Sequence, residues 1–239
     1  MNEPLHDRPA RQGVGSPGAR AVRRSSVTFK VRRRGLSPAR QARFTEWLAR
    51  WGLDETGPVI DWSAEFGASC PVVLDIGFGH GESISQMALA DPSTAIVGLE
   101  IHTPGVATLL QAIEAHRLTN VRVVHGDVLP FLDRVAPSSL AGVRIYFPDP
   151  WPKVRQHHRR LVDVEVVGAL TDRLMIGGTL HLATDIDDYA RVMLAAADGD
   201  ERLTGGEIER PTFRPVTRFE RRGIDEGRHP TDLWFVRQR

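Results

Sequence analysis

The hydrophobic pattern changes near residue 71, where short apolar runs begin to alternate with amphipathic stretches. Short runs of aliphatic residues between turn signals fit buried strands, which we expect at residues 72–76, 95–100, 121–125, 142–147, 179–183 and 233–237. The stretches between them predict helices at residues 82–90, 103–118, 129–135, 161–174 and 187–197. This alternation indicates the α/β class, with a mostly parallel, doubly wound sheet covered by helices on both faces.

The N-terminal part of the chain follows a different pattern. Residues 1–26 are rich in Gly, Pro, Ser and Arg and nearly free of large apolar residues, which predicts a disordered basic tail. Ser37-Pro38 then favours a helix start, and an apolar stripe ends at Gly52. We therefore expect a tail at 1–26, a segment with one amphipathic helix at 27–60, and the main domain at 61–239, with loop and linker over 52–70.

Composition limits the class of protein. The 239 residues are 41% hydrophobic and 26% charged, a balance typical of globular proteins. Cys70 is the single cysteine, which excludes an internal disulfide framework. Neither a membrane-spanning apolar run nor a signal peptide is recognisable, so we expect a soluble, cytoplasmic protein without membrane contact. Whether it is a monomer or a homodimer stays open.

Charge is distributed unevenly although the net charge is only +1. Residues 1–34 hold nine basic and two acidic side chains, a net of +7, which leaves 22 basic and 28 acidic side chains, a net of −6, elsewhere. A basic end on an acidic body favours an anionic polymer as partner, nucleic acid before a membrane surface. Codon bias is the alternative, because 29 of the 31 basic residues are arginine.

A glycine-rich turn follows the first strand of the main domain, as the sequence DIGFGHG at residues 75–81. Glycines at alternate positions let the backbone approach a ligand closely, and α/β sheets bind nucleotides at this position. The spacing G-x-G-x-G differs from the dinucleotide fingerprint, and no Lys-Ser/Thr pair follows as it would in a phosphate-binding P-loop. A merely structural tight turn remains the alternative.

Four consecutive predicted strands end in a carboxylate, at Asp75, Glu100, Asp127 and Asp149. Parallel strands bring these ends to one edge of the sheet, where Glu100 could accept both hydroxyls of a ribose and Asp127 could meet an adenine edge. Acidic residues favour a ligand that has a cationic head and lacks phosphates. S-adenosylmethionine fits, because it combines a ribose and an adenine with a sulfonium and an ammonium.

The segment after the fourth strand, FPDPWPK at residues 147–153, is stiffened by three prolines. It leads into a run of basic and imidazole side chains, among them Arg155, Arg159 and Arg160. Aromatic and basic residues beside a cleft indicate phosphate contacts and base stacking, with an ordinary solvated basic face as the alternative. No cysteine or paired-histidine spacing supports a metal site here.

Several of these motifs together resemble the bacterial tRNA (guanine-N7-)-methyltransferase family. The resemblance runs from about residue 27 to the C-terminus, and the proline-rich loop and the TRFE segment are its most specific parts. The motifs that carry it are DIGFGHG at 75–81, GLEIH at 98–102, GD at 126–127, FPDPWPKVRQHHRR at 147–160, ATD at 183–185 and RPVTRFERRG at 214–223.

The resemblance implies a Rossmann-like class I methyltransferase that moves the methyl group of S-adenosylmethionine to N7 of a tRNA guanosine, at position 46 of the variable loop. It implies a catalytic Asp149 and no metal. The donor would be held by Asp75, Gly77, Gly79, Glu100, Asp127 and Asp149. The substrate would meet Lys153, Asp185, Thr217, Arg218, Phe219 and Glu220, and further RNA contacts would come from Arg155, Arg159 and Arg160.

Individual roles follow from the chemistry of N7 methylation. Asp185 and Glu220 could accept the N1–H and N2–H of guanine, and Trp151 or Phe219 could stack on the extruded base. The chain departs from the family pattern at Asp75, where Glu is usual, and at Arg218, where Lys is usual.

Other functions would leave other signatures in the sequence. A methyltransferase acting on another RNA, a protein or a small molecule would keep the glycine turn and the acids without needing Lys153 or the basic run. A non-catalytic RNA-binding protein would be expected to lose the strand-end acids, and all four are present. An NAD-dependent oxidoreductase would show the six-residue glycine spacing, which is absent.

Overall fold

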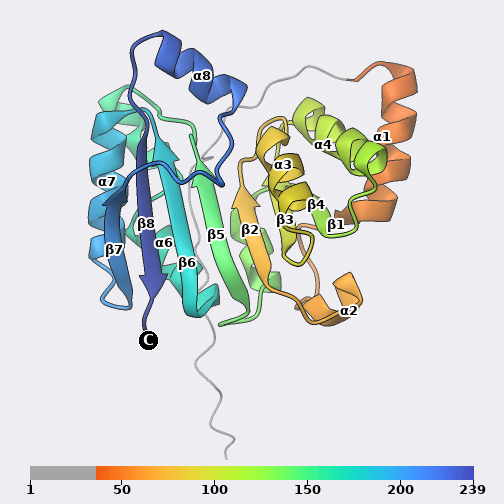
Figure 1. Cartoon of the computed structure of the whole chain (residues 1–239), viewed down its shortest axis with the longest axis horizontal. Helices are drawn as coiled ribbons and strands as arrows, with labels where there is room; N and C mark the ends of the chain where they lie inside the picture. Colours follow the sequence, from red (N-terminus) through yellow and green to blue (C-terminus); the bar gives the residue numbers. More distant parts are fainter. Residues whose placement is uncertain (1–35) are drawn as a thin grey trace, which may run out of the picture.

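The computed structural model describes residues 36–239, so the expected tail at 1–26 and the first part of the 27–60 segment lie outside the described residues. One eight-stranded sheet runs through the described part, in the order β1-β4-β3-β2-β5-β6-β8-β7 (Figure 1). Its strands are β1 Gly52–Leu53, β2 Val72–Ile76, β3 Ala95–Glu100, β4 Val121–His125, β5 Leu140–Tyr146, β6 Leu174–Thr184, β7 Leu203–Ile208 and β8 Thr231–Arg237.

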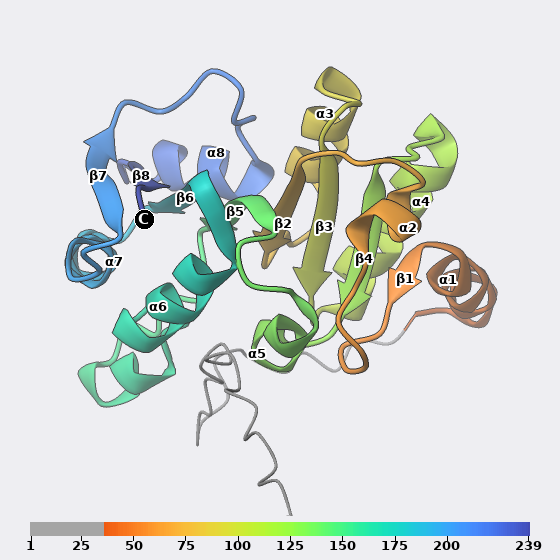
Figure 2. The same ribbon diagram turned by 90° about the horizontal axis from the view of Figure 1, so that it is seen from below.

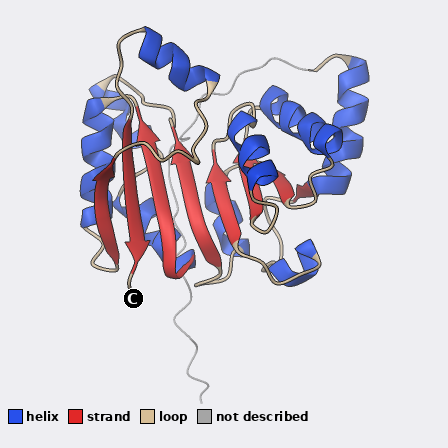
Figure 3. Cartoon of the chain, viewed as in Figure 1, coloured by secondary structure: helices blue, strands red, loops and turns tan. Residues whose placement is uncertain are grey.

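Helices fill most connections between the strands (Figure 3). The α-helices are α1 Pro38–Trp51, α2 Trp62–Phe66, α3 Glu82–Ala90, α4 Thr103–His116, α5 Val128–Phe131, α6 Val164–Arg173, α7 Asp187–Asp198 and α8 Arg218–Asp225. Two 3₁₀ helices, η1 Leu132–Arg134 and η2 Val154–Arg159, complete them.

Strand direction divides the sheet into two parts. From β1 to β6 every paired neighbour is parallel, whereas β8 runs antiparallel to both β6 and β7. The carboxyl ends of β2, β3, β4 and β5 therefore lie at one edge of the sheet. The chain builds the sheet outward from β2 in one direction, through β3 and β4, and then crosses to the other side of β2 to form β5 and β6. Ligands of open α/β sheets bind at such a switch point.

Helices cover both faces of the sheet, as Figure 2 shows from below, and a hydrophobic core lies on each face. One face buries an aliphatic cluster against α5, α6 and α7, and the other buries a second cluster against α3, α4 and α1. Strands buried on both faces read as continuous apolar runs, and all five residues of β2 are buried. The cluster beside α6 and α7 also extends under β6 and β8, through Leu180, Leu182 and Phe235.

The N-terminal helix adds to the sheet edge. Phe44 and Trp51 of α1 are buried against the α4 side of the core, and β1 then pairs in parallel with β4. Residues 52–70, expected as loop and linker, thus contain β1 and the short helix α2.

The sequence-based elements are largely confirmed, with β2, β3 and β4 matching in full. The structure adds five elements that the pattern does not predict: β1, α2, η2, β7 and α8. One boundary was wrong, because Gly177-Gly178 do not end α6. That helix ends at Arg173, and both glycines lie inside the irregular start of β6, where the register with β5 shifts. Within residues 36–239, no helix is both long and apolar enough to cross a membrane.

Candidate active site

A cavity of about 520 Å³ opens at the carboxyl ends of β2 to β5, between the glycine turn, the proline-rich loop and the first turn of α8. All four strand-end acids line it, so the expectation that the fold brings them to one edge is confirmed. The wall also includes Gly77, Gly79, Thr217, Arg218 and Phe219 from the sequence-based set. Lys153, Asp185, Glu220, Arg155, Arg159 and Arg160 are not part of the wall.

The glycine turn bends through three left-handed residues, with φ of 76° at Gly77, 62° at Gly79 and 76° at Gly81. Only glycine adopts such angles without strain. A β-carbon at Gly81 would lie 2.7 Å from the Leu109 side chain, whereas one at Gly77 or Gly79 would meet nothing within 4 Å. The turn therefore packs closely on α4 at its end and leaves its first two glycines open toward the cavity.

Asp75 is the deepest of the acids, with 2% of its surface exposed. Its Oδ2 has no hydrogen-bond partner, and the neighbouring Nη1 of Arg144 on β5 lacks one too. Burial raises the pKa of the Asp75 carboxyl to about 6, although the Arg144 charge opposes this shift. A buried carboxylate without a partner is costly unless a ligand satisfies it.

Glu100 and Asp127 are held by backbone amides. Glu100 accepts from the N–H of Gly79 at 2.9 Å through Oε2, and from those of Ile101 and His102 at 2.8 and 2.9 Å through Oε1. Asp127 caps α5 by accepting from Leu129 N–H at 3.2 Å. Both carboxylates thus face the cavity from fixed positions with lone pairs left for ligand hydroxyl or amine donors.

The loop that carries Asp149 is bounded by two strained residues, Phe147 at φ 52° and Trp151 at φ 43°. Such left-handed angles are costly for aromatic residues and persist only where the surroundings enforce them. Arg160 supplies part of that enforcement, because its Nε donates to the Pro150 carbonyl at 2.9 Å and its Nη2 to Asp188 at 2.6 Å. The loop therefore holds Asp149 at the cavity wall in one conformation.

Two side chains of this region lie elsewhere than the sequence predicts. The sequence predicts RNA contact for Arg160, but this side chain is buried beneath the loop in the contacts just described, over the Tyr189 ring. It also predicts base stacking for Trp151, but the indole is buried and the Arg159 guanidinium lies 3.8 Å from the ring centroid. Lys153 and Arg155 are exposed on the adjoining surface, where contact with a polyanion remains a prediction.

The segment expected as a substrate loop is the start of α8. Thr217 caps this helix by accepting from Glu220 N–H at 3.1 Å, and Arg218 pairs with Glu82 of α3 at 2.8 Å. Phe219 is 54% exposed, lines the cavity and lies 5.7 Å from Phe147, measured between ring centroids. Thr217, Arg218 and Phe219 close one side of the cavity.

Glu220 and Asp185 do not line the cavity, and both carboxylates are paired with an arginine. Both oxygens of the buried Glu220 accept from Arg214 at 2.8 Å. The Asp185 carboxylate is also buried and accepts from Arg228 at 2.6 Å. Because both acids lie in motifs, the sequence predicts that they face a ligand. The spacing of residues along the chain does not reveal that Arg214 and Arg228 bind these carboxylates.

Other wall residues are not predicted by the sequence. They come from the glycine turn, from the starts of α3 and α4 and from the end of β5, and they include Phe78, His80, Glu82, His102, Thr103 and Tyr146. Most of these residues lie within or next to a motif in the sequence. Their position in the sequence near a motif is therefore the one signal that could have predicted them as cavity residues. The described residues contain no group of three or more His, Cys, Asp or Glu side chains placed to hold a metal ion.

Solved structures share this fold. The 16S rRNA methyltransferase KamB aligns with a TM-score of 0.55 at 14% identity, covering 77% of this chain and 96% of its own. A 30S ribosomal A1408 methyltransferase from an uncultured bacterium aligns with a TM-score of 0.53, also at 14% identity, covering 77% and 98%. The fold is accordingly the Rossmann-like fold of class I methyltransferases.

Sequence relatives are much closer. The family model described as "Putative methyltransferase" matches residues 69–233. The tRNA (guanine-N(7)-)-methyltransferase of Streptomyces avermitilis is 41% identical over 97% of this chain and 80% of its own length, and that of Bordetella pertussis is 40% identical over 95% and 90%. Such identity over nearly the whole chain shows that this protein belongs to the tRNA (guanine-N(7)-)-methyltransferase family.

Proposed function

We propose that this protein transfers the methyl group of S-adenosylmethionine to N7 of a guanosine in tRNA. The observation that carries the proposal is the cavity in which the glycine turn and four strand-end carboxylates meet the proline-rich loop and α8. The names of the relatives at about 40% identity support the choice of tRNA and of N7. Position 46 of the variable loop follows from the family resemblance.

The cavity residues fit this donor. The unpartnered Oδ2 of Asp75 suits the donor ammonium, and the open side of Gly77 and Gly79 leaves room where a β-carbon would intrude. In this proposal Glu100 accepts from the ribose hydroxyls and Asp127 accepts from the adenine amine. When bound, S-adenosylmethionine supplies an electrophilic methyl group on a sulfonium.

Guanine N7 carries a lone pair that is free in Watson–Crick pairing, so the attack needs no general base. Catalysis then depends on alignment, with reacting atoms held about 3–3.5 Å apart. The strained and braced loop around Asp149 is suited to this task, because its position is set before the substrate arrives. The target base must leave its tRNA contacts to reach the cavity, at a cost of a few kcal/mol.

Methylation at N7 places positive charge on the purine. Asp149, at the cavity wall, can stabilise that charge as it develops, in a site where water is partly excluded. Phe219 is exposed at the same wall and offers an aromatic face for the base. Lys153 and Arg155 lie on the outside of the loop, where they can contact phosphates and hold the tRNA in register.

The direct test uses the purified protein, labelled S-adenosylmethionine and an unmodified tRNA transcript. Transfer to N7 makes the modified site sensitive to borohydride and aniline, so strand scission should appear at one guanosine. Label incorporation without scission would place the methyl group on another atom, and absence of incorporation would remove the proposal.

Asp149→Ala provides the matched active-site test. Loss of a charge-stabilising group costs about 100-fold or more in kcat, so transfer should fall at least this far. Binding of S-adenosylhomocysteine should weaken much less, because Asp75, Glu100 and Asp127 remain. Wild-type turnover in this variant would contradict the role given to Asp149.

A further inference from the structure

A continuous chain of buried polar contacts leads from the cavity wall, across β6 and β8, to the first turn of α8. The Tyr146 hydroxyl lies 2.7 Å from His181 Nδ1, and His181 Nε2 lies 2.7 Å from Asp232 Oδ1. Arg214 donates two hydrogen bonds of 2.8 Å to Asp232 and two more of 2.8 Å to Glu220. The chain joins β5, β6 and β8 to α8.

The protonation states follow from the partners. A carboxylate can only accept, so His181 Nε2 carries the proton that is donated to Asp232, and Nδ1 accepts from the Tyr146 hydroxyl. Burial lowers the pKa of His181 despite the hydrogen bond to Asp232, which keeps the ring neutral. Burial also raises the pKa of Tyr146, so its hydroxyl stays protonated.

Arg214 is the centre of this chain. Burial alone would lower the pKa of the guanidinium, but the hydrogen bonds to Glu220 and Asp232 outweigh it and the pKa is raised. Its planar fork donates four hydrogen bonds to two carboxylates, more than the three donors of a lysine ammonium can supply. Arg210 adds a second cation 3.2 Å from Glu220, so two guanidinium groups balance two carboxylates.

The first turn of α8 needs such an anchor. Residues 209–217 between β7 and α8 contain no regular helix or strand, so ladder hydrogen bonds do not fix the start of the helix. Thr217, Arg218 and Phe219 from this start line the cavity, and Glu220 points the other way into the buried network. The position of the Phe219 ring is therefore set through Glu220 and Arg214 by Asp232 on β8.

We infer that Arg214 is a positioning residue for methyl transfer, which holds the first turn of α8 against the sheet so that this turn presses the acceptor base toward the donor. The inference rests on the proposed function. Arg214 touches neither donor nor acceptor, because it is buried behind the wall and absent from it. It acts through Glu220, whose neighbours in the turn form the contact surface.

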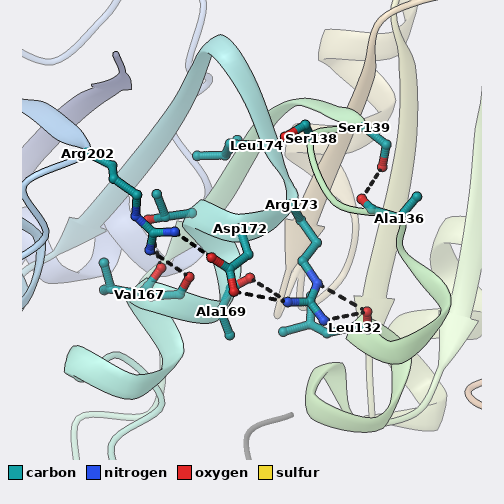
Figure 4. A network of polar contacts seen from close by, with 12 residues as sticks. Leu132, Ala136, Ser138, Ser139, Val167, Ala169, Asp172, Arg173, Leu174 and Arg202 are labelled. Carbon is teal, nitrogen blue, oxygen red and sulfur yellow. Dashed lines mark hydrogen bonds and ion pairs between the residues drawn. The ribbon is translucent and has the colours of Figure 1, made fainter. Parts of the chain in front are cut away.

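Arg214→Lys tests the inference because it keeps the charge and loses the fork. Arg173→Lys is the matched control, since Arg173 is also fully buried and also bonds several acceptors, the carbonyls of Leu132 and Ala169 among them (Figure 4). Arg173 directly precedes β6, which pairs with β5 from Leu174 opposite Leu140 to Ala183 opposite Tyr146, so Arg173 lies roughly 20 Å from the cavity end of these strands. Both variants should lose thermal stability.

The concentration of folded protein is measured as the amount of S-adenosylhomocysteine bound at saturation, because only folded protein binds this ligand. A kcat calculated from that concentration separates positioning from folding. In Arg214→Lys, the Kd for S-adenosylhomocysteine and the KM for tRNA should stay near wild type while kcat falls about 100-fold, the usual cost of a small misplacement of reacting groups. Arg173→Lys should keep the wild-type kcat. Wild-type kcat in Arg214→Lys would overturn the inference.

If Arg214→Lys does not fold, Glu220→Gln decides by the same measurements, because it leaves the pair between Arg214 and Asp232 in place. A fall in kcat at unchanged Kd and KM supports the inference, and wild-type kcat overturns it. Failure of the proposed function would show instead in the wild-type protein, as absence of methyl transfer to tRNA, and the inference would fall with it.

Discussion

Among single residues, Asp75 is the most buried of the four cavity acids and also has an unsatisfied oxygen. Its carboxyl carries a pKa raised to about 6, so folding favours its protonated form. The contribution of this carboxyl to the stability of the folded state is therefore greatest at pH values below its ordinary pKa of 3.8. Stability falls as the pH rises from there through about 6, and it levels off above that value.

Asp75→Asn should therefore stabilise the ligand-free protein at pH 8, by roughly 1–3 kcal/mol, because the neutral amide does not carry the cost of a buried charge. At pH 4 the difference between the two proteins should nearly vanish. The same substitution should weaken binding of S-adenosylhomocysteine by removing the negative charge opposite its ammonium. Thermal melts across this pH range check the first part, and a Tm difference that is independent of pH would refute it.

The sequence predicts the role of a residue only where that role depends on residues close to it along the chain. Strand-end positions and left-handed glycines indicate Asp75, Glu100 and Gly77 as cavity residues. Glu220 lies in an equally specific motif, yet its side chain is bound by Arg214. That pairing depends on how α8 lies over β8, which hydrophobic pattern and spacing do not specify.

Elements divide in the same way. The strands whose ends line the cavity are largely apolar, so the hydrophobic pattern alone predicts them. The edge strand β7 contains two glycines and has mostly exposed side chains, and α8 is mostly charged, so both lack the apolar periodicity on which the expectations relied. Charged residues in and beside one short helix, η2, also differ in role, since Arg160 points inward and Arg155 outward.

This difference beside η2 can be measured. Arg160→Ala should lower stability by roughly 1–3 kcal/mol, because it removes two hydrogen bonds beneath the loop, and it should leave the salt dependence of tRNA binding unchanged. Lys153→Ala with Arg155→Ala should leave the Tm unchanged and reduce the slope of log K against log salt by about one for each phosphate that is no longer neutralised. Equal slopes for the double variant and wild type would exclude phosphate contact at this surface.

At the scale of the whole molecule, the acidic cavity and the basic N-terminal residues differ in the ligands that their charges favour. The cavity is acidic and suits a cationic donor, whereas residues 1–34 carry a net charge of +7. Residues 1–26 hold five basic and two acidic side chains, so they contribute +3 of this charge. Long-range attraction to a polyanion falls off with ionic strength.

Deleting residues 1–26 should therefore weaken tRNA binding at low salt, with a smaller effect at high salt, and should leave kcat near its wild-type value. Filter binding at several salt concentrations and single-turnover rates measure the two quantities. Complete loss of methyl transfer would show instead that these residues belong to the catalytic site.

The reversal of chain direction at β8 has one more consequence. In the proposed reaction, the acids and glycines at the ends of β2 to β5 hold the donor, whereas the start of α8, on the acceptor side, is bound to β8 through Glu220 and Arg214. In that proposal, the donor side and the start of α8 come from separate stretches of the polypeptide, and Asp149 lies at the wall that they share. A chain that exchanged its last third could recognise a new acceptor and still keep its donor site, so specificity can diverge here without rebuilding the chemistry.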